Sequence, residues 1–247
     1  ISGITRVSDE ITLMKCVLYR VENNYITDAE QMGVDIGYNS DSNRVENNTV
    51  TGFVKTTALA PQAGLRIGLC SERDTLIKNL IYNNSGTSFR GGVWLDESTL
   101  TQTGITTKDN QNNLIQENII HSNTGSGIVL SNNSSGQCIN NVITRNSTYN
   151  NTGLGIDLNY NGTAGPVTVS LDDDGDVDAG PNNIQNFPLI DSVRKLTATT
   201  VAFYGKAPAG ATIEFFITDA QTNMHGGTTL NYGEGRTYIG TLVEGSG

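Results

Sequence analysis

A short phrase recurs five times along this chain of 247 residues. Each copy starts with an asparagine, places an aliphatic residue two positions later and ends, after a turn, in Gly-aliphatic-x-aliphatic. The clearest copy runs from Asn118 and Ile120 to Gly127, Ile128 and Leu130. The leading residues of the five copies are Asn24, Asn48, Asn79, Asn118 and Asn141. A repeat this short cannot bury its own apolar face, so successive copies have to stack on one another.

The repeat predicts strands rather than helices. Its apolar residues alternate with a period of two, and the interval from Asn118 to Asn141 is too short for a pair of helices with loops. Each copy therefore predicts two or three short strands, with glycine supplying the positive φ of the corners. Stacked copies form parallel ladders at about 4.8 Å per strand, in which equivalent asparagines pass amide hydrogen bonds along the stack. The expected inward column is Ile36, Ile67, Leu95, Leu130 and Leu158.

These repeats resemble the right-handed parallel β-helix repeat family, the coil shared by pectate-lyase-like and many bacterial surface proteins. The resemblance covers roughly residues 1–190. It implies the fold, but it implies little about activity, because lyases, hydrolases, epimerases, adhesins and phage tailspikes all use this coil.

The pattern changes towards the C-terminus. After Leu158 the repeat stops, and alternating apolar residues predict antiparallel strands at 200–204, 212–218 and 237–243. We expect these strands to form part of an immunoglobulin-like sandwich. The segment 180–188 resembles the junction at which bacterial surface β-helices pass into such sandwiches. The predicted fold class is therefore all-β, a right-handed parallel β-helix over 1–190 followed by a partial antiparallel β-sandwich over 191–247.

Composition limits the partners. The formal net charge of −10 and the isoelectric point of about 4.6 argue against nucleic acid and anionic membranes as partners. No apolar run is long enough for membrane insertion. Three cysteines show neither metal-ligand spacing nor an even-numbered disulfide framework. Because both ends break off within a pattern, we expect an ordered portion of a longer exported chain, with self-association or neighbouring domains of that chain as partners.

An acidic run lies in the expected junction loop, 159–183. Four aspartates stand at alternate positions around Gly175, namely Asp172, Asp174, Asp176 and Asp178. Calcium takes six to eight oxygen ligands, and closely spaced carboxylates in a glycine-containing loop supply them. The run resembles the loops of calcium-binding surface repeats, so we predict calcium as the cofactor. A solvated acidic linker without metal is the alternative.

A candidate glycan site comes from aligning the repeats. The outward residues between the two inward aliphatics are Asp35, Arg66, Trp94, Val129 and Asp157, with Asp96 two residues after the tryptophan. A tryptophan face suits a pyranose ring, arginine suits a carboxylate or sulfate, and paired carboxylates can cleave a glycosidic bond. We therefore predict that Arg66, Trp94 and Asp96 share one exposed face, with Asp35 and Asp157 as further glycan-binding candidates. An ordinary solvated sheet face is the alternative.

No catalytic residue can be assigned. The chain lacks the paired-Asp, Gly-His-Gly and Arg-x-Lys patterns of polygalacturonase-like enzymes, and His121 and His225 are isolated in the sequence. The residues after each leading asparagine form a second outward column that is partly apolar: Tyr25, Thr49, Leu80, Ile119 and Val142. Such a stripe indicates a covered surface, unless a bend turns these residues inward.

Two functional hypotheses follow. The first is an extracellular bacterial surface or filament protein, in which a rigid β-helix has a structural or adhesive role with polysaccharide or glycan as a ligand. The alternative is a polysaccharide-active enzyme, a lyase or glycosidase, that uses the outward face of the coil.

Overall fold

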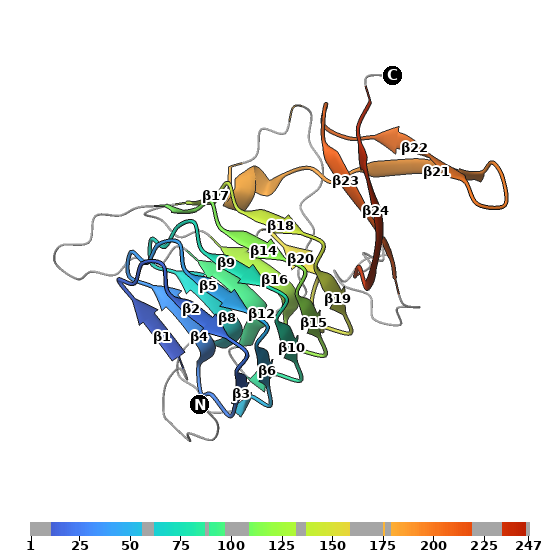
Figure 1. Ribbon diagram of the computed structural model, residues 1–247. Coiled ribbons are helices and arrows are strands. Elements are labelled where there is room, and N and C mark those ends of the chain that lie inside the picture. The colour runs from blue at the N-terminus through green and yellow to red at the C-terminus, as the bar shows by residue number, and fades with distance from the viewer. Residues whose placement is uncertain are drawn as a thin grey trace.

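The computed structural model shows a three-sided coil of parallel strands followed by two antiparallel hairpins (Figure 1). It describes residues 11–55, 62–86, 89–96, 109–131, 137–158, 175, 179–218 and 234–245. Each turn of the coil contributes one strand to each of three stacked sheets. The predicted all-β class and the parallel β-helix are thus confirmed.

The three long sheets of the coil have the following strands. The first contains β1 (Ile11–Met14), β4 (Met32–Gly37), β8 (Gln62–Gly68), β12 (Phe89–Asp96), β16 (Ser126–Ser131) and β20 (Ile156–Asp157). The second contains β2 (Arg20–Glu22), β5 (Arg44–Glu46), β9 (Thr75–Ile77), β14 (Leu114–Gln116) and β18 (Val142–Thr144). The third contains β3 (Tyr25–Thr27), β6 (Thr49–Thr51), β10 (Leu80–Tyr82), β15 (Ile119–His121) and β19 (Ser147–Tyr149).

Shorter elements complete the described chain. Two pairs of short parallel strands lie at the corners, β7 (Val54–Lys55) with β11 (Ser85–Gly86) and β13 (Asn110–Gln111) with β17 (Cys138–Ile139). A 3₁₀ turn, η1 (Pro181–Ile184), follows the coil. The hairpins pair β21 (Leu189–Lys195) with β22 (Val201–Lys206) and β23 (Thr212–Ile217) with β24 (Thr237–Val243).

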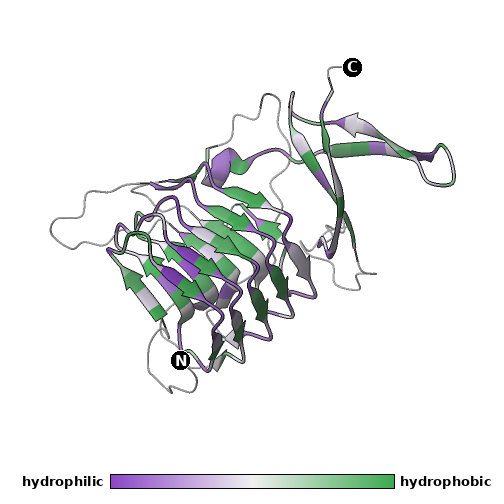
Figure 2. Ribbon diagram, in the orientation of Figure 1, coloured by the Kyte–Doolittle hydropathy of each residue, from purple (hydrophilic) through white to green (hydrophobic). Residues whose placement is uncertain are grey.

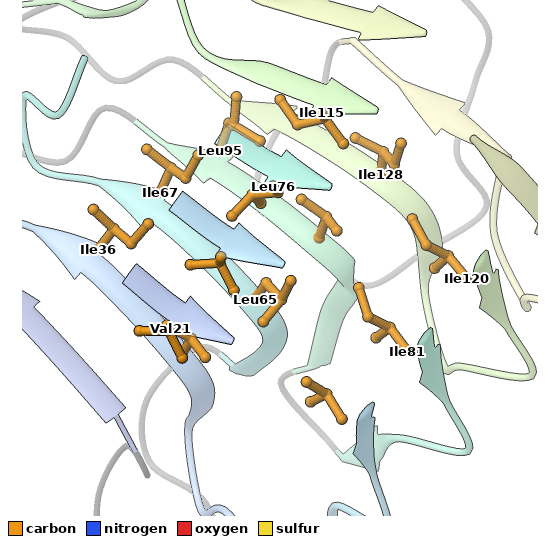
Figure 3. Packing of buried hydrophobic residues seen from close by; sticks show 14 of the residues in the cluster. Val21, Ile36, Leu65, Ile67, Leu76, Ile81, Leu95, Ile115, Ile120 and Ile128 are labelled. Carbon is orange, nitrogen blue, oxygen red and sulfur yellow. The ribbon is translucent and has the colours of Figure 1, made fainter. Parts of the chain in front are cut away.

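The core fills the coil with stacked aliphatic side chains (Figure 3). Ile36, Ile67, Leu95 and Leu130 lie in register on adjacent strands of the first sheet, and Leu158 packs against the same core. The second sheet contributes Val21, Val45, Leu76 and Ile115, and the third contributes Ile26, Val50, Ile81 and Ile120. The predicted inward column is therefore confirmed. Figure 2 shows the matching hydropathy, with apolar strands joined by hydrophilic corners.

Glycine makes fewer of the corners than expected: Gly52 and Gly125 have positive φ, but most positive-φ residues in the described part of the coil are not glycine. The residue before each asparagine at the corner between the second and third sheets has a left-handed backbone with φ between 52° and 59°, and these residues are Asn23, Asn47, Lys78, Glu117 and Arg145. A left-handed non-glycine residue costs about 1–2 kcal/mol, so the surrounding contacts have to hold it in place. The asparagine that follows each of these residues provides such contacts.

Asparagine side chains form ladders along the corners. Between the second and third sheets, Nδ2 of each asparagine donates to Oδ1 of the next at 2.9–3.0 Å, through Asn24, Asn48, Asn79, Asn118 and Asn146. Each Oδ1 also accepts a hydrogen bond from the backbone N–H of the asparagine one turn earlier. Asn141, the predicted leading residue of the last repeat, belongs to a different ladder, with Asn113. The sequence alignment was wrong there because both corners carry asparagine.

The glycines of the repeat allow the sheets to approach closely. A Cβ atom on Gly64 would lie 2.6 Å from both the Gly92 carbonyl oxygen and Ile81 Cγ2. On Gly127 it would lie 2.6 Å from the Gly155 carbonyl oxygen and 2.9 Å from Thr148 Cγ2. Glycine is therefore required because a larger residue would collide with the third sheet and with the next turn.

The C-terminal hairpins form a partial sandwich. Phe203 of β22 and Phe215 of β23 bring the two hairpins together, with ring centroids 4.4 Å apart. Most other apolar residues of these strands are exposed, for example Val193 at 57% and Leu242 at 54%. The antiparallel strands agree with the sequence prediction. The immunoglobulin-like assignment and the boundary at residue 190 stay predictions.

Side chains from beyond the coil close its last turn. Asn141 N–H donates to Asn182 Oδ1 at 3.0 Å, and Asn151 donates to the Glu234 carboxylate from its backbone N at 3.1 Å and from Nδ2 at 2.7 Å. Arg145 N–H donates to the Glu214 carboxylate at 2.8 Å. Asn182 and Glu234 thus supply side-chain oxygens where the next turn would have placed an asparagine, and Glu214 replaces the backbone carbonyl that the next turn would have supplied at the Arg145 corner.

We predict that Gly64→Ala destabilises the coil by about 1–3 kcal/mol, because the added methyl group has no space. The free energy of unfolding, from denaturant titration followed by circular dichroism, measures this loss. Gly37→Ala is the control, since its Cβ would meet only the flexible end of Leu69 at 3.3 Å. Equal stability of the two variants would contradict the packing role of Gly64.

Candidate functional site

The outward face of the first sheet brings together the predicted site residues. Asp35 pairs with Arg66, Arg66 with Trp94, Trp94 with Val129, and Val129 with Asp157. The register predicted for this column is therefore confirmed. Asp96 lies two residues after Trp94 on the same strand, β12, and points to the same side.

Arg66 connects the two carboxylates beside it. Its Nε and Nη2 donate to Asp96 Oδ1 and Oδ2 at 2.7 and 3.2 Å, a bidentate contact. Its Nη1 donates to both Asp35 oxygens at 3.2 and 3.3 Å. The guanidinium carbon also lies 5.0 Å from the centre of the Trp94 ring. The Arg66 guanidinium therefore contacts two carboxylates and the Trp94 ring, and these groups lie on three successive turns of the coil.

These residues are buried, so the expectation of an exposed face is wrong. Trp94 is 8% exposed, Arg66 9% and Asp96 4%, and Trp94 Nε1 donates to Ser131 Oγ at 2.9 Å. Trp94 also packs with Met32, Ala63 and Val129 as a small apolar cluster outside the main core. Alternation along a strand predicts the side of the sheet on which a residue lies, but it does not show whether that side is covered.

The chemistry of this cluster is that of a buried ion-pair network. Asp35 and Asp96 are both hydrogen-bonded to Arg66, which neutralises charge that burial would otherwise make costly. Asp157 is 2% exposed at the far end of the column. As arranged, the ring faces and carboxylates contact protein groups, and a sugar could reach them only after rearrangement. Glycan binding by this face stays a prediction.

The second outward column is partly confirmed. Tyr25, Thr49, Leu80 and Ile119 are in register on the third sheet, and Tyr25 and Ile119 are 56% and 44% exposed. No bend turns these two residues inward. Ser147 completes the column, while Val142, assigned to it from the sequence, pairs with Leu114 on the second sheet. This correction has the same cause as the shifted leading asparagine.

An aromatic stack on the third sheet was missed from the sequence. The His121 ring lies between Tyr82 and Tyr149, with centroid distances of 5.2 and 4.5 Å, and the Arg236 guanidinium lies 4.5 Å from the Tyr149 ring centre. Burial, followed by the charge of Arg236, lowers the pKa of His121, so its ring is neutral at neutral pH. All three rings occupy the position after the inward residue of the third sheet, a regularity that would have predicted the stack.

The predicted calcium site lies outside the part of the chain that the structure describes. The acidic run Asp172, Asp174, Asp176 and Asp178 lies outside the described residues, as does His225, so the calcium site stays a prediction. Within the described ranges, no three His, Cys, Asp or Glu side chains gather closely enough to hold a metal ion. No helix in the described part of the chain is long and apolar enough to cross a membrane.

Comparison with known proteins identifies the coil. Residues 13–172 match the family model described as the right handed beta helix region. This match spans more than half of the chain, so the chain belongs to that β-helix family. No curated protein and no solved structure matched the chain. Membership establishes the fold but not an activity, because function resides in sites that differ among proteins of one fold.

We predict that Arg66→Met destabilises the coil by about 3–5 kcal/mol, because it leaves the Asp35 and Asp96 carboxylates buried without their counter-charge. The free energy of unfolding at neutral pH measures the loss. Arg20→Met is the matched control, since Arg20 is exposed and its ion pairs with Glu22 and Glu46 are loose. A loss no larger than that of the control would mean that the network does not stabilise the fold.

Proposed function

We propose that the chain is a rigid structural element of an extracellular bacterial surface or filament protein. The coil forms a stiff rod and holds the antiparallel hairpins at one end. The observation that carries this proposal is the capping of the last turn by Asn182, Glu214 and Glu234, because it bonds the two parts of the chain to each other.

The contacts at the end of the coil support a fixed connection rather than a flexible one. The carboxylate of Glu234 is 1% exposed and accepts two hydrogen bonds from Asn151. Thr148 N–H, at the edge of the third sheet, donates to the Gly235 carbonyl oxygen at 2.9 Å. Charge-assisted hydrogen bonds contribute about 1.5–3 kcal/mol each, so this set of contacts resists separation of the hairpins from the coil.

An enzymatic role has less support. A glycosidase or lyase would need a carboxylate or a base that reaches the scissile bond. Asp35 and Asp96, the carboxylates nearest to Trp94, are buried and bound to Arg66. Adhesion through glycans needs less rearrangement than catalysis does, so we keep glycan binding as part of the proposal, with Arg66, Trp94, Asp96, Asp35 and Asp157 as the residues to test.

Surface labelling combined with a polysaccharide panel tests this function. An antibody against the chain should label intact cells of the organism that makes it, and the purified protein should release no sugar product from the panel. Labelling only after lysis would contradict a surface role. Product release that is lost in Asp96→Asn would favour the enzyme. Glycan retention that is lost in a folded Trp94→Ala variant, and kept in Tyr25→Ala, would locate adhesion on the first sheet.

We also predict that the acidic run binds calcium and stiffens the junction loop. Titrating metal-free protein with calcium in a calorimeter should give a saturable heat, and a chelator should lower the melting temperature. The double variant Asp174→Asn/Asp176→Asn should lose both effects, while Asp191→Asn, at an exposed strand position, should keep them. The absence of heat and an unchanged melting temperature would identify the run as a solvated linker.

A further inference from the structure

One ladder contains an aspartate in place of an asparagine. Along the corner before the second sheet, the chain places Asn43, Asp74, Asn113, Asn141 and Asn182 in sequence. Asn43 donates to Asp74 Oδ1 from its backbone N at 2.7 Å and from Nδ2 at 3.0 Å. On this side Asp74 does what an asparagine would do, because its Oδ1 accepts the two hydrogen bonds.

The other oxygen of Asp74 occupies the place of an amide nitrogen. In the next step of the ladder, Asn113 donates to Asn141 Oδ1 from both its backbone N and its Nδ2. Asp74 donates to Asn113 Oδ1 only from its backbone N, at 2.8 Å. The Asp74 residue is fully buried, and its Oδ2 has no hydrogen-bond partner. An ionised carboxylate here turns a lone pair towards the Asn113 acceptor, whereas a protonated one supplies the missing hydrogen.

We propose that Asp74 is a pH-sensitive element of the coil, held as the neutral acid whose Oδ2–H donates to Asn113 Oδ1, and that loss of this proton to the solvent loosens the ladder. The neutral acid gives this corner the same hydrogen-bond pattern as its asparagine neighbours. The ionised form removes one ladder bond and leaves a buried charge.

The charged groups beside Asp74 are one cation and two carboxylates. Arg73 forms ion pairs with Asp41 and Glu72 on the exposed side of the corner. The pKa of Asp74 is raised from 3.8 to about 7, chiefly by burial and in smaller part by the charge of Asp41, while the hydrogen bonds from Asn43 and the charge of Arg73 act in the opposite direction. No cation lies in the ladder itself to hold the ionised form, because its other members are asparagines.

The direction of the pH effect follows from the raised pKa. Below about pH 4, the carboxyl is protonated in both the folded and the unfolded chain, and the stabilisation by the ladder proton is complete. Between pH 4 and 7 the folded chain keeps a proton that the unfolded chain has lost, so stability falls as pH rises. Above pH 7 this contribution is absent. The free energy of unfolding of the coil should therefore be larger in mildly acidic than in alkaline medium.

Asp74→Asn tests the proposal, because it supplies a permanent donor at the same position. The measured quantity is the equilibrium constant of unfolding of the wild type divided by that of Asp74→Asn. This ratio should rise about a thousandfold between pH 4 and pH 8, because the pKa of Asp74 is about three units higher in the folded than in the unfolded chain and each unit contributes a factor of ten. Asp191→Asn removes an exposed carboxylate as the control, and its ratio should stay nearly constant. A ratio for Asp74→Asn that does not change with pH would overturn the proposal.

A second measurement on the wild-type protein does not depend on any variant folding. The carboxyl carbon of Asp74, followed by nuclear magnetic resonance, should titrate with a midpoint near pH 7. The amide hydrogens of Asn43 and Asp74 donate in this ladder, and their protection factors, which correct for the intrinsic rise of exchange with pH, should fall above that midpoint. The protection factors of Asn79 and Asn118 in the parallel ladder should fall less. A midpoint near pH 4 would show that Asp74 is ionised in the ladder and would refute the inference.

Discussion

The fold depends on hydrogen-bond partners for the backbone N–H groups at the corners of the coil, where the chain leaves one sheet and has not yet entered the next. A backbone N–H group left unbonded in a buried corner costs about 1–3 kcal/mol, and this coil has several such corners in every turn. Asparagine answers the requirement because one side chain accepts from the turn before it and donates to the turn after it. The left-handed residues that precede the ladders are held in place by these bonds, so the sharp corners and the ladders support each other.

The sequence predicted the parts of the structure that follow from periodicity. Alternation of apolar residues placed Ile36, Ile67, Leu95 and Leu130 in one column, and the register was right because each is anchored by a Gly-aliphatic-x-aliphatic phrase. Periodicity failed where two corners carry the same residue type. Asn141 and Asn146 both follow a left-handed residue, and only the pairing of Ile115 with Ile143 shows which of them leads the repeat.

The candidate site shows a second limit of reading from sequence. The column Asp35, Arg66 and Trp94 was placed on the correct side of the sheet, but its burial could not be predicted, because alternation gives the side of the sheet and not what packs against that side. From the sequence, Arg66 was interpreted as a ligand for a carboxylate or sulfate of a glycan. In the structure its partners are instead two aspartates on the neighbouring turns, 31 and 30 residues away in the chain.

The ladders also give the coil a polarity. Every asparagine accepts from the turn before it and donates to the turn after it, so at its last corners the coil presents hydrogen-bond donors. The groups that close this end are mainly acceptors, among them the carboxylates of Glu214 and Glu234. A lysine or arginine side chain could not replace them, because it has only donors to offer. The direction in which the side-chain amides align along a stack thus requires that this end of the coil be closed by hydrogen-bond acceptors, which here are the amide oxygen of Asn182 and the carboxylates of Glu214 and Glu234.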